Sequence, residues 1–316
     1  FFTSQISLMN DVRIQSTALT TFVVDSTADT NDFSDTDDLC DTDDSVGDGP
    51  CTLRAAIVQA NATAGTDTIN FNIPGAGVHT LSPSSNYAAI TESIIIDGTT
   101  EAGANCSTST LVIEIDGTGI LGGSDALAVS GLATKAVTIK GLVIQNFNDS
   151  AIVLTGGSGS TATITCNIIG LDSDKVTTNP NQNGILVGDN FNATIGGATA
   201  SDRNIISGNT NTGIQIFSSG TATIQGNYIG TAASGTIDKG NAIGIQANTG
   251  ATTISNNVIS YNDSAIRLHG AYTDNYGPLD ILNNIIGLNS SGDTAAGNGI
   301  GINFTTGDQS EGYWGD

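Results

Sequence analysis

Four side chains near the end of the chain have types and spacing suited to sugar contact or catalysis. They are two basic and two aromatic residues: Arg267, His269, Tyr272 and Tyr276. On an expected strand, Arg267 and His269 lie two residues apart and therefore face the same outer surface. Asp263 or Asp274 could pair with them, and the tyrosine rings could stack on a sugar. Because two outward polar residues on a strand usually only face solvent, we assign no catalytic residue.

A second candidate site is the segment 25–49, which holds ten Asp and few apolar residues. Carboxylate oxygens at alternate positions are ligands that Ca²⁺ prefers. The favoured ligands belong to two Asp-x-Asp runs: Asp35, Asp37, Asp41 and Asp43. The segment lacks the sixth-position Gly and the closing Glu of an EF-hand. Weak calcium binding and a solvated acidic loop therefore remain equally open.

The expected strand around residue 267 is one of a series of repeated phrases between residues 146 and 304. An Asn precedes an apolar pair six times: Asn146, Asn167, Asn204, Asn227, Asn257 and Asn284. Each is followed by a phrase with apolar residues two apart, such as Ile266 and Leu268. Alternation with a period of two predicts strands, and repeats of roughly 20–50 residues indicate a solenoid. We therefore predict a parallel β-helix of roughly ten coils, right-handed like nearly all parallel crossovers.

The repeats also predict the corners of the coils and one decorated face. Asn tolerates the left-handed backbone of a tight corner, and stacked amides can hydrogen-bond from coil to coil. We expect five Asn to form one corner column: Asn167, Asn204, Asn227, Asn257 and Asn284. Every second coil carries an insertion rich in small polar residues, and equal insertions at equal phase project from one face. The insertions are Leu171–Asn183, Thr231–Ala242 and Leu288–Asn298.

The chain has four Cys, two of which lie near the end of the acidic segment. Cys40 and Cys51 predict a disulfide that closes a small loop, worth about 2–3 kcal/mol in a secreted protein. The pairing of Cys106 with Cys166 stays open, because these residues could lie two or more coils apart. The chain contains no Cys-x-x-Cys, and neither His lies near a Cys, which disfavours a metal site built on Cys.

The segment Cys51–Ala62 predicts the one helix of the chain. Thr52 is a possible N-cap, and Leu53, Ile57 and Ala60 fall on one helical face. The first coil of a β-helix exposes unpaired strand edges and an open core. We expect this amphipathic helix to cover that end.

The sequence of this helix resembles a known family. CTLRAAIVQAN, preceded by STADTND and followed by GTDTINFNIPG, is similar to the Cys-Ser/Thr-Leu-Arg-Glu/Ala-Ala-Ile signature of secreted prokaryotic β-helix repeat proteins. The later phrases NATIGGATASDRNIISGNTNTGIQIF and TATIQGNYIGTAASGT resemble the repeats of that family. The resemblance spans residues of about 20 to 304. It implies a large surface or secreted protein, often without an assigned enzymatic activity. Arg54, inside the signature, is expected to form a cap or an ion pair with the acidic loop.

Composition excludes several partners. Of 316 residues, 40 are Gly and 12% are charged, which suits short strands with tight corners rather than helices. The net charge of −23 argues against nucleic acid and anionic membranes, whose phosphates need clustered Lys and Arg. The chain has no apolar run of 18, so we expect no membrane span. We expect an extracellular or cell-surface protein.

Two classes of function remain. The first is a non-enzymatic structural protein, such as a filament or sheath subunit or an adhesin-like rod. The second is a carbohydrate-active enzyme or polysaccharide-binding module of the pectate-lyase-like type. Sites of that type need Arg or Lys beside a calcium-binding carboxylate cluster, or three Asp with His and Arg-x-Lys. This chain has no Arg-x-Lys and only scattered Lys and Arg. We therefore favour the structural protein and expect no enzymatic activity.

The expected organisation places an assembly element at each end. It comprises residues 1–67 as arm, acidic loop and helix, 68–304 as β-helix, and 305–316 as a tail. The arm Phe1–Ser16 alternates apolar residues and could add as a strand to a neighbouring subunit. We expect copies to associate end to end through this arm and an open C-terminal coil. Seven Asn-x-Ser/Thr sequons are present, of which Asn105 and Asn289 are the plausible glycan acceptors.

Overall fold

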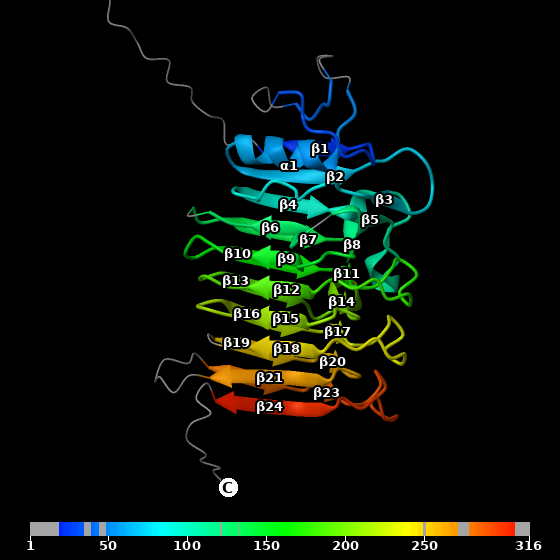
Figure 1. Cartoon of the computed structure of the whole chain (residues 1–316), viewed down its shortest axis with the longest axis vertical. Helices are drawn as coiled ribbons and strands as arrows, with labels where there is room; N and C mark the ends of the chain where they lie inside the picture. The colour runs from blue at the N-terminus through cyan, green and yellow to red at the C-terminus, as the bar shows by residue number, and fades with distance from the viewer. Residues whose placement is uncertain are drawn as a thin grey trace, which may run out of the picture.

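The protein is a stack of parallel coils. The computed structural model describes residues 19–34, 39–43, 49–120, 122–131, 133–248, 251–270 and 278–306. Within these ranges strands form three long parallel sheets, which we name A, B and C, and one α-helix, α1 (Leu53–Ala62), lies at the N-terminal end (Figure 1). The chain visits the sheets in turn, so successive strands of one sheet belong to successive coils. The predicted parallel β-helix is confirmed.

The strands are short, and each sheet runs the length of the stack. Sheet A contains β1 (Thr21–Val24), β2 (Thr66–Phe71), β4 (Ser93–Asp97), β7 (Ala136–Lys140), β10 (Thr161–Thr165), β13 (Asn192–Gly196), β16 (Thr221–Gln225), β19 (Thr252–Ser255) and β22 (Leu279–Leu282). Sheet B contains β3 (His79–Leu81), β5 (Ile113–Asp116), β8 (Leu142–Gln145), β11 (Ile168–Ile169), β14 (Ile205–Ile206), β17 (Tyr228–Ile229), β20 (Val258–Ile259) and β23 (Ile285–Ile286). Sheet C contains β6 (Leu127–Val129), β9 (Ser150–Leu154), β12 (Asn183–Val187), β15 (Thr212–Ile216), β18 (Ile243–Ala247), β21 (Ser264–Gly270) and β24 (Ile300–Thr306). Four single 3₁₀ turns lie in the loops: η1 (Gly98–Thr100), η2 (Cys106–Thr108), η3 (Gly117–Gly119) and η4 (Ala200–Asp202).

The core is a set of stacked aliphatic side chains. In sheet A one inward register position holds Ile on eight successive strands: Ile69, Ile96, Ile139, Ile164, Ile195, Ile224, Ile254 and Ile281. The first seven are completely buried. Because strand side chains alternate, the positions between them face outward and can be polar. The period-two pattern in the sequence therefore sets which residues form the core.

Helix α1 closes the N-terminal end, as predicted. The Thr52 hydroxyl caps it by accepting a hydrogen bond from the Ala55 N–H at 3.1 Å. Leu53, Ile57 and Ala60 are buried in the main core, and the helix packs beside β1 and β2 (Figure 1). Strand β1 precedes the helix yet belongs to sheet A, and β24 continues to Thr306, so the solenoid extends beyond 68–304 at both ends.

The predicted corner column exists. The side-chain amides of five Asn form a ladder, with each Nδ2 donating to the Oδ1 of the next at 2.9–3.1 Å: Asn167, Asn204, Asn227, Asn257 and Asn284. The backbone N–H of each of the first four donates to the same Oδ1. The expected reason is only partly right, because the left-handed residue is often the one before the ladder Asn, as at Cys166 and Asn256. Asn146 lies outside this ladder and donates to Asp116.

A second ladder, which we did not predict, lines the corner between sheets B and C. Its members are Asn181, Asn209, Asn241, Asn262 and Asn298, again linked from Nδ2 to Oδ1 at 2.9–3.2 Å. The signal was present in the sequence, since four of these Asn stand three residues before the Gly or Ala that opens each second phrase. In the coils that carry these ladders, side-chain amides therefore satisfy backbone groups at two corners.

The three insertions project from one face, as predicted (Figure 1). Each is closed by an antiparallel bridge at the same phase: Leu171 with Thr178, Thr231 with Asp238, and Leu288 with Ala295. The third insertion also rests on the second, because the Ser290 N–H donates to the Gly235 carbonyl at 3.0 Å. Equal phase along the stack thus places insertions from different coils in contact.

Candidate functional site

Two interactions at the N-terminal end hold the acidic segment (residues 25–49) on helix α1. They are the Cys40–Cys51 disulfide and the Arg54–Asp29 ion pair, which together we call the clip. Cys40 and Cys51 form the expected disulfide, with a Cα–Cα distance of 5.1 Å. The buried Arg54 guanidinium pairs with Asp29 at 2.8 Å, donates to two backbone carbonyls and lies over the Tyr87 ring. Burial opposes ionisation of Asp29, but hydrogen bonds from Arg54 and Ser84 outweigh it and hold the pKa of that carboxyl below its ordinary value. Arg54 therefore pairs with the acidic segment, as we expected.

The calcium prediction falls partly outside the described residues, because Asp35 and Asp37 are not among them. Asp41 is buried, and its backbone N–H donates to the Asp32 carboxylate at 3.2 Å. In the described ranges no group of three or more His, Cys, Asp or Glu side chains gathers as a metal site. Whether the four predicted Asp bind calcium therefore stays a prediction.

Arg267 and His269 lie on the outer face of sheet C, on strand β21. The inward neighbours Ile266 and Leu268 are buried, so the two basic side chains share the outward direction that we predicted. Arg267 is half-buried, and its Nε has no hydrogen-bond partner in the part of the chain that the structure covers. His269 is exposed, as is Asp263 at the start of the same coil. The candidates Tyr272, Asp274 and Tyr276 lie outside the described residues.

Strand register brings further residues to the outer face of sheet C beside Arg267, and we did not predict them from the sequence. Gln215, Gln246, Arg267 and Asn303 occupy one outward position on four successive strands of sheet C. Side-chain amides and a guanidinium in a row can hydrogen-bond to hydroxyl groups of an extended ligand. Their spacing in the sequence is irregular because of the insertions, so only the register brings them together.

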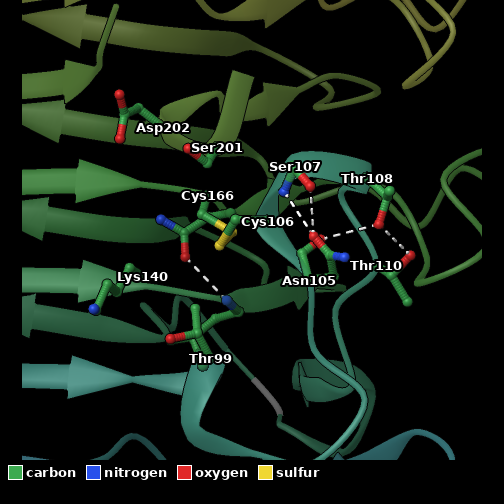
Figure 2. The surroundings of a disulfide bond; sticks show 12 residues. Thr99, Asn105, Cys106, Ser107, Thr108, Thr110, Lys140, Cys166, Ser201 and Asp202 are labelled. Atoms are coloured by element: carbon green, nitrogen blue, oxygen red, sulfur yellow. Dashed lines mark hydrogen bonds between the residues drawn. A yellow bond between two sulfur atoms is a disulfide. The ribbon is translucent and has the colours of Figure 1, made fainter. Parts of the chain in front are cut away.

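The second Cys pair fastens a loop to the outer face of sheet B. Cys106, in η2, forms a disulfide with Cys166, which precedes the first ladder Asn (Figure 2). The disulfide belongs to a small apolar cluster on that face, which includes Val143, Ile168 and Ile205. Because the loop crosses coils along the stack, it joins residues 60 apart in sequence. The pairing that the sequence left open is therefore present.

Glu114, on β5 of sheet B, is an acid whose environment opposes ionisation. Burial raises the pKa of its carboxyl, and the nearby Asp172 and Asp116 raise it further, against a hydrogen bond from Thr80 at 3.0 Å. The residue is buried, and its carboxyl lies near Asp172 and Ser173 of the first insertion. Among the described residues no ion pair joins Glu114 to a cation, and we assign it no catalytic role.

The two favoured sequons differ in accessibility. Asn105 is exposed, and its Oδ1 accepts hydrogen bonds from the Ser107 N–H and hydroxyl (Figure 2). Asn289 is buried at the base of the third insertion, and its Nδ2 donates to Asp293 at 2.8 Å. Of these two sequons, only Asn105 presents its side chain on the surface of the folded protein.

No described helix is long and apolar enough to cross a membrane. A scan against protein-family models, a search among curated proteins and a search among solved structures each found no match.

Proposed function

We propose that this protein is a non-enzymatic extracellular rod whose copies join end to end, as a subunit of a filament or sheath. The observation that carries the proposal is the contrast between an N-terminal end covered by α1 and a C-terminal end that no described residue covers. The two disulfides support an oxidising, extracellular location, because such bonds persist there and are rare in the cytosol. The resemblance to secreted β-helix repeat proteins points the same way.

The C-terminal edge comprises β22, β23 and β24, each the last strand of its sheet. Its apolar side chains are exposed where their neighbours one coil earlier are not. Phe304 is 75% exposed while Leu268, its register partner, is 7% exposed, and Ile302 is 42% exposed while Ile266 is fully buried. Such an edge offers apolar surface and unpaired backbone groups to another strand.

Each of the two Asn ladders ends at this edge with a backbone N–H group. Each earlier rung donates its backbone N–H to the Oδ1 of the following Asn. The N–H groups of the last rungs, Asn284 and Asn298, find no acceptor among the residues described here. A strand that covers the edge must therefore bring acceptors to both corners as well as apolar side chains.

The partner that we favour is the arm Phe1–Ser16 of a second copy, a segment outside the described residues. Helix α1 covers the core at the other end, so two bare coils cannot simply stack. An apolar-alternating arm can instead add to the open sheet as a strand. Because the donor and acceptor surfaces differ, the contact propagates in one direction and produces a filament.

The test is the assembly state measured by light scattering and electron microscopy. Full-length protein should form concentration-dependent end-to-end assemblies, and a variant lacking residues 1–16 should remain a folded monomer. Phe304→Asp should block assembly from the acceptor side, whereas Val176→Asp, at an exposed apolar residue on an insertion, should not. A full-length protein that stays monomeric at high concentration would contradict the filament and leave an isolated adhesin-like rod.

A second candidate is polysaccharide binding by the outer face of sheet C. The row of Gln215, Gln246, Arg267 and Asn303 favours it, together with the predicted contributions of His269, Tyr272 and Tyr276. Binding to an alginate and pectin panel tests it, with Arg267→Ala as the loss variant. Retention of binding in that variant would assign the ligand to another face.

We also propose weak calcium binding by the acidic segment, with Asp35, Asp37, Asp41 and Asp43 as ligands. The favourable chemistry is the density of hard carboxylate oxygens. Chelation should lower the melting temperature and expose the segment to protease. If neither changes, the segment is a solvated loop.

A further inference from the structure

The outer face of sheet A carries a regular array of threonines. One outward register position holds Thr on five successive strands, β7 to β19: Thr138, Thr163, Thr194, Thr223 and Thr253. The next outward position, two residues earlier, holds Thr161, Asn192 and Thr221. We call the five threonines together with Thr161 and Thr221 the threonine face.

The layer beneath keeps this face flat. Small side chains repeat under it at one register position, Ala162, Ala193 and Ala222, and Ile repeats at the next. Since β10, β13 and β16 present the same residues to the core, these three coils stack evenly, while the Ala position holds Val137 on β7 and Thr252 on β19. The outward side chains therefore form a lattice with ~4.8 Å between coils and ~6.7 Å along each strand.

The threonine side chains are held rigid in this lattice. A β-branched side chain on a strand has restricted rotation about χ1, and register neighbours above and below restrict it further. Methyl and hydroxyl groups therefore recur at fixed spacing. A rigid array loses little conformational entropy when it binds a partner with a similar repeat.

The hydroxyls of the threonine face are free to bind an external partner. None of these seven side-chain hydroxyls makes a hydrogen bond to another described residue, and Thr161, Thr163, Thr194 and Thr223 are exposed. Threonines in the loops behave differently, since Thr99, Thr118 and Thr177 each donate to a nearby Asp carboxylate. The hydroxyls of the threonine face are thus available to an external partner, whereas those three loop hydroxyls are already used.

The chemistry of the face selects the kind of partner. In a chain of net charge −23, the seven positions contain no charged and no aromatic side chain. The Lys140–Asp97 ion pair and Asp280, the register partner of Thr253, lie beside the array. A soluble sugar normally needs a concave site with aromatic surface and convergent polar groups, which this face lacks. A flat, neutral, periodic surface of hydroxyls and methyls fits a partner that is itself an extended hydrogen-bonded lattice with a similar repeat.

We propose that the threonine face binds the surface of ice. The hydroxyls join the lattice as hydrogen-bonding groups, and the methyls order the water between them because apolar groups restrict the orientation of first-shell water. Each contact is weak, and the rigid repetition over five strands makes their sum effective. This activity does not depend on assembly through the ends of the rod.

The experiment measures thermal hysteresis and enrichment of the protein in slowly grown ice. Wild-type protein should show both. Thr194→Tyr should abolish both, because a large ring in the centre of the threonine face keeps the ice surface away from the neighbouring threonines. Val153→Tyr places the same ring on the outer face of sheet C, on strand β9, and should behave like wild type. Thr163→Tyr provides a second loss variant, and the melting temperature identifies variants that remain folded.

Several outcomes would overturn the proposal. They are a wild-type protein without hysteresis or enrichment, folded Thr194→Tyr and Thr163→Tyr variants that match wild type, and loss of activity in Val153→Tyr. The variant lacking residues 1–16 separates this activity from the filament. If it is monomeric and still enters ice, the two functions are independent.

Discussion

The two ends of the solenoid meet the same physical requirement in different ways. At the N-terminal end, α1 buries Leu53 and Ile57 against the first strands, and the Cys40–Cys51 disulfide and Arg54 hold the covering segment in place. At the C-terminal edge, Leu282 is 51% exposed and Phe304 is 75% exposed. A coil thus needs both apolar cover and acceptors for its backbone, and only one end receives them from the described chain.

The largest loss of stability should come from truncating a buried side chain at the covered N-terminal end. We expect Ile57→Ala to lower the free energy of unfolding by about 2–5 kcal/mol, because Ile57 is fully buried and its truncation leaves a cavity. The matched change at the open edge, Leu282→Ala, should cost less than about 0.5 kcal/mol, because that side chain is already largely in water. Urea unfolding of both variants measures the difference. Equal costs would show that the C-terminal edge is covered in solution.

Removing the disulfide of the clip should have the next largest effect. Cys40→Ser with Cys51→Ser should cost about 3 kcal/mol, since the bond restricts the unfolded chain and holds the acidic segment on α1. Thermal unfolding without reductant measures the loss. In a background with Cys106→Ser and Cys166→Ser, reductant should lower the melting temperature toward that of the protein that also lacks Cys40–Cys51. A variant as stable as wild type would mean that the helix alone secures the end.

The first Asn ladder, from Asn167 to Asn284, allows a buried position to be compared with one at the C-terminal edge. Asn227→Ala should cost about 2 kcal/mol, because it leaves the buried Asn204 N–H without its acceptor. Asn284→Ala, at the open edge, should cost about 1 kcal/mol, because water can reach the groups that it frees. Amide hydrogen exchange at Asn204 and Asn257 reports each lost acceptor directly. If Asn284→Ala proves the costlier change, the edge is not solvated.

The smallest effect should be the acid sensitivity of the clip. The folded-state pKa of Asp29 lies below its usual 3.8, so its pairing with Arg54 stabilises the protein above that pH and is lost as pH falls through the lowered value. Asp29→Asn should cost about 1 kcal/mol at neutral pH and nothing in strong acid. Unfolding measured between neutral pH and pH of about 2 tests this. A constant difference between wild type and variant would exclude titration of Asp29 as its cause.

Several features of the candidate sites could not be predicted from the sequence. The outward direction of Arg267 and His269 followed from their spacing, but the row with Gln215, Gln246 and Asn303 depends on strand register. The Cys106–Cys166 bond was equally hidden, because the loop that carries Cys106 travels along the stack. The threonine face was visible only as scattered Thr-x-Thr pairs until parallel pairing aligned them.

The sequence by itself determined the architecture: apolar alternation selects strands, repeated Asn mark one corner, and the amphipathic segment after Cys51 forms the cap. These are local properties, which each coil expresses with its own residues. The tertiary structure alone decided which residues from different coils become neighbours. Insertions of unequal spacing hide the coil phase in the linear chain, whereas backbone pairing between coils restores it. The second Asn ladder, the polar row on sheet C and the threonine face all arise from that pairing.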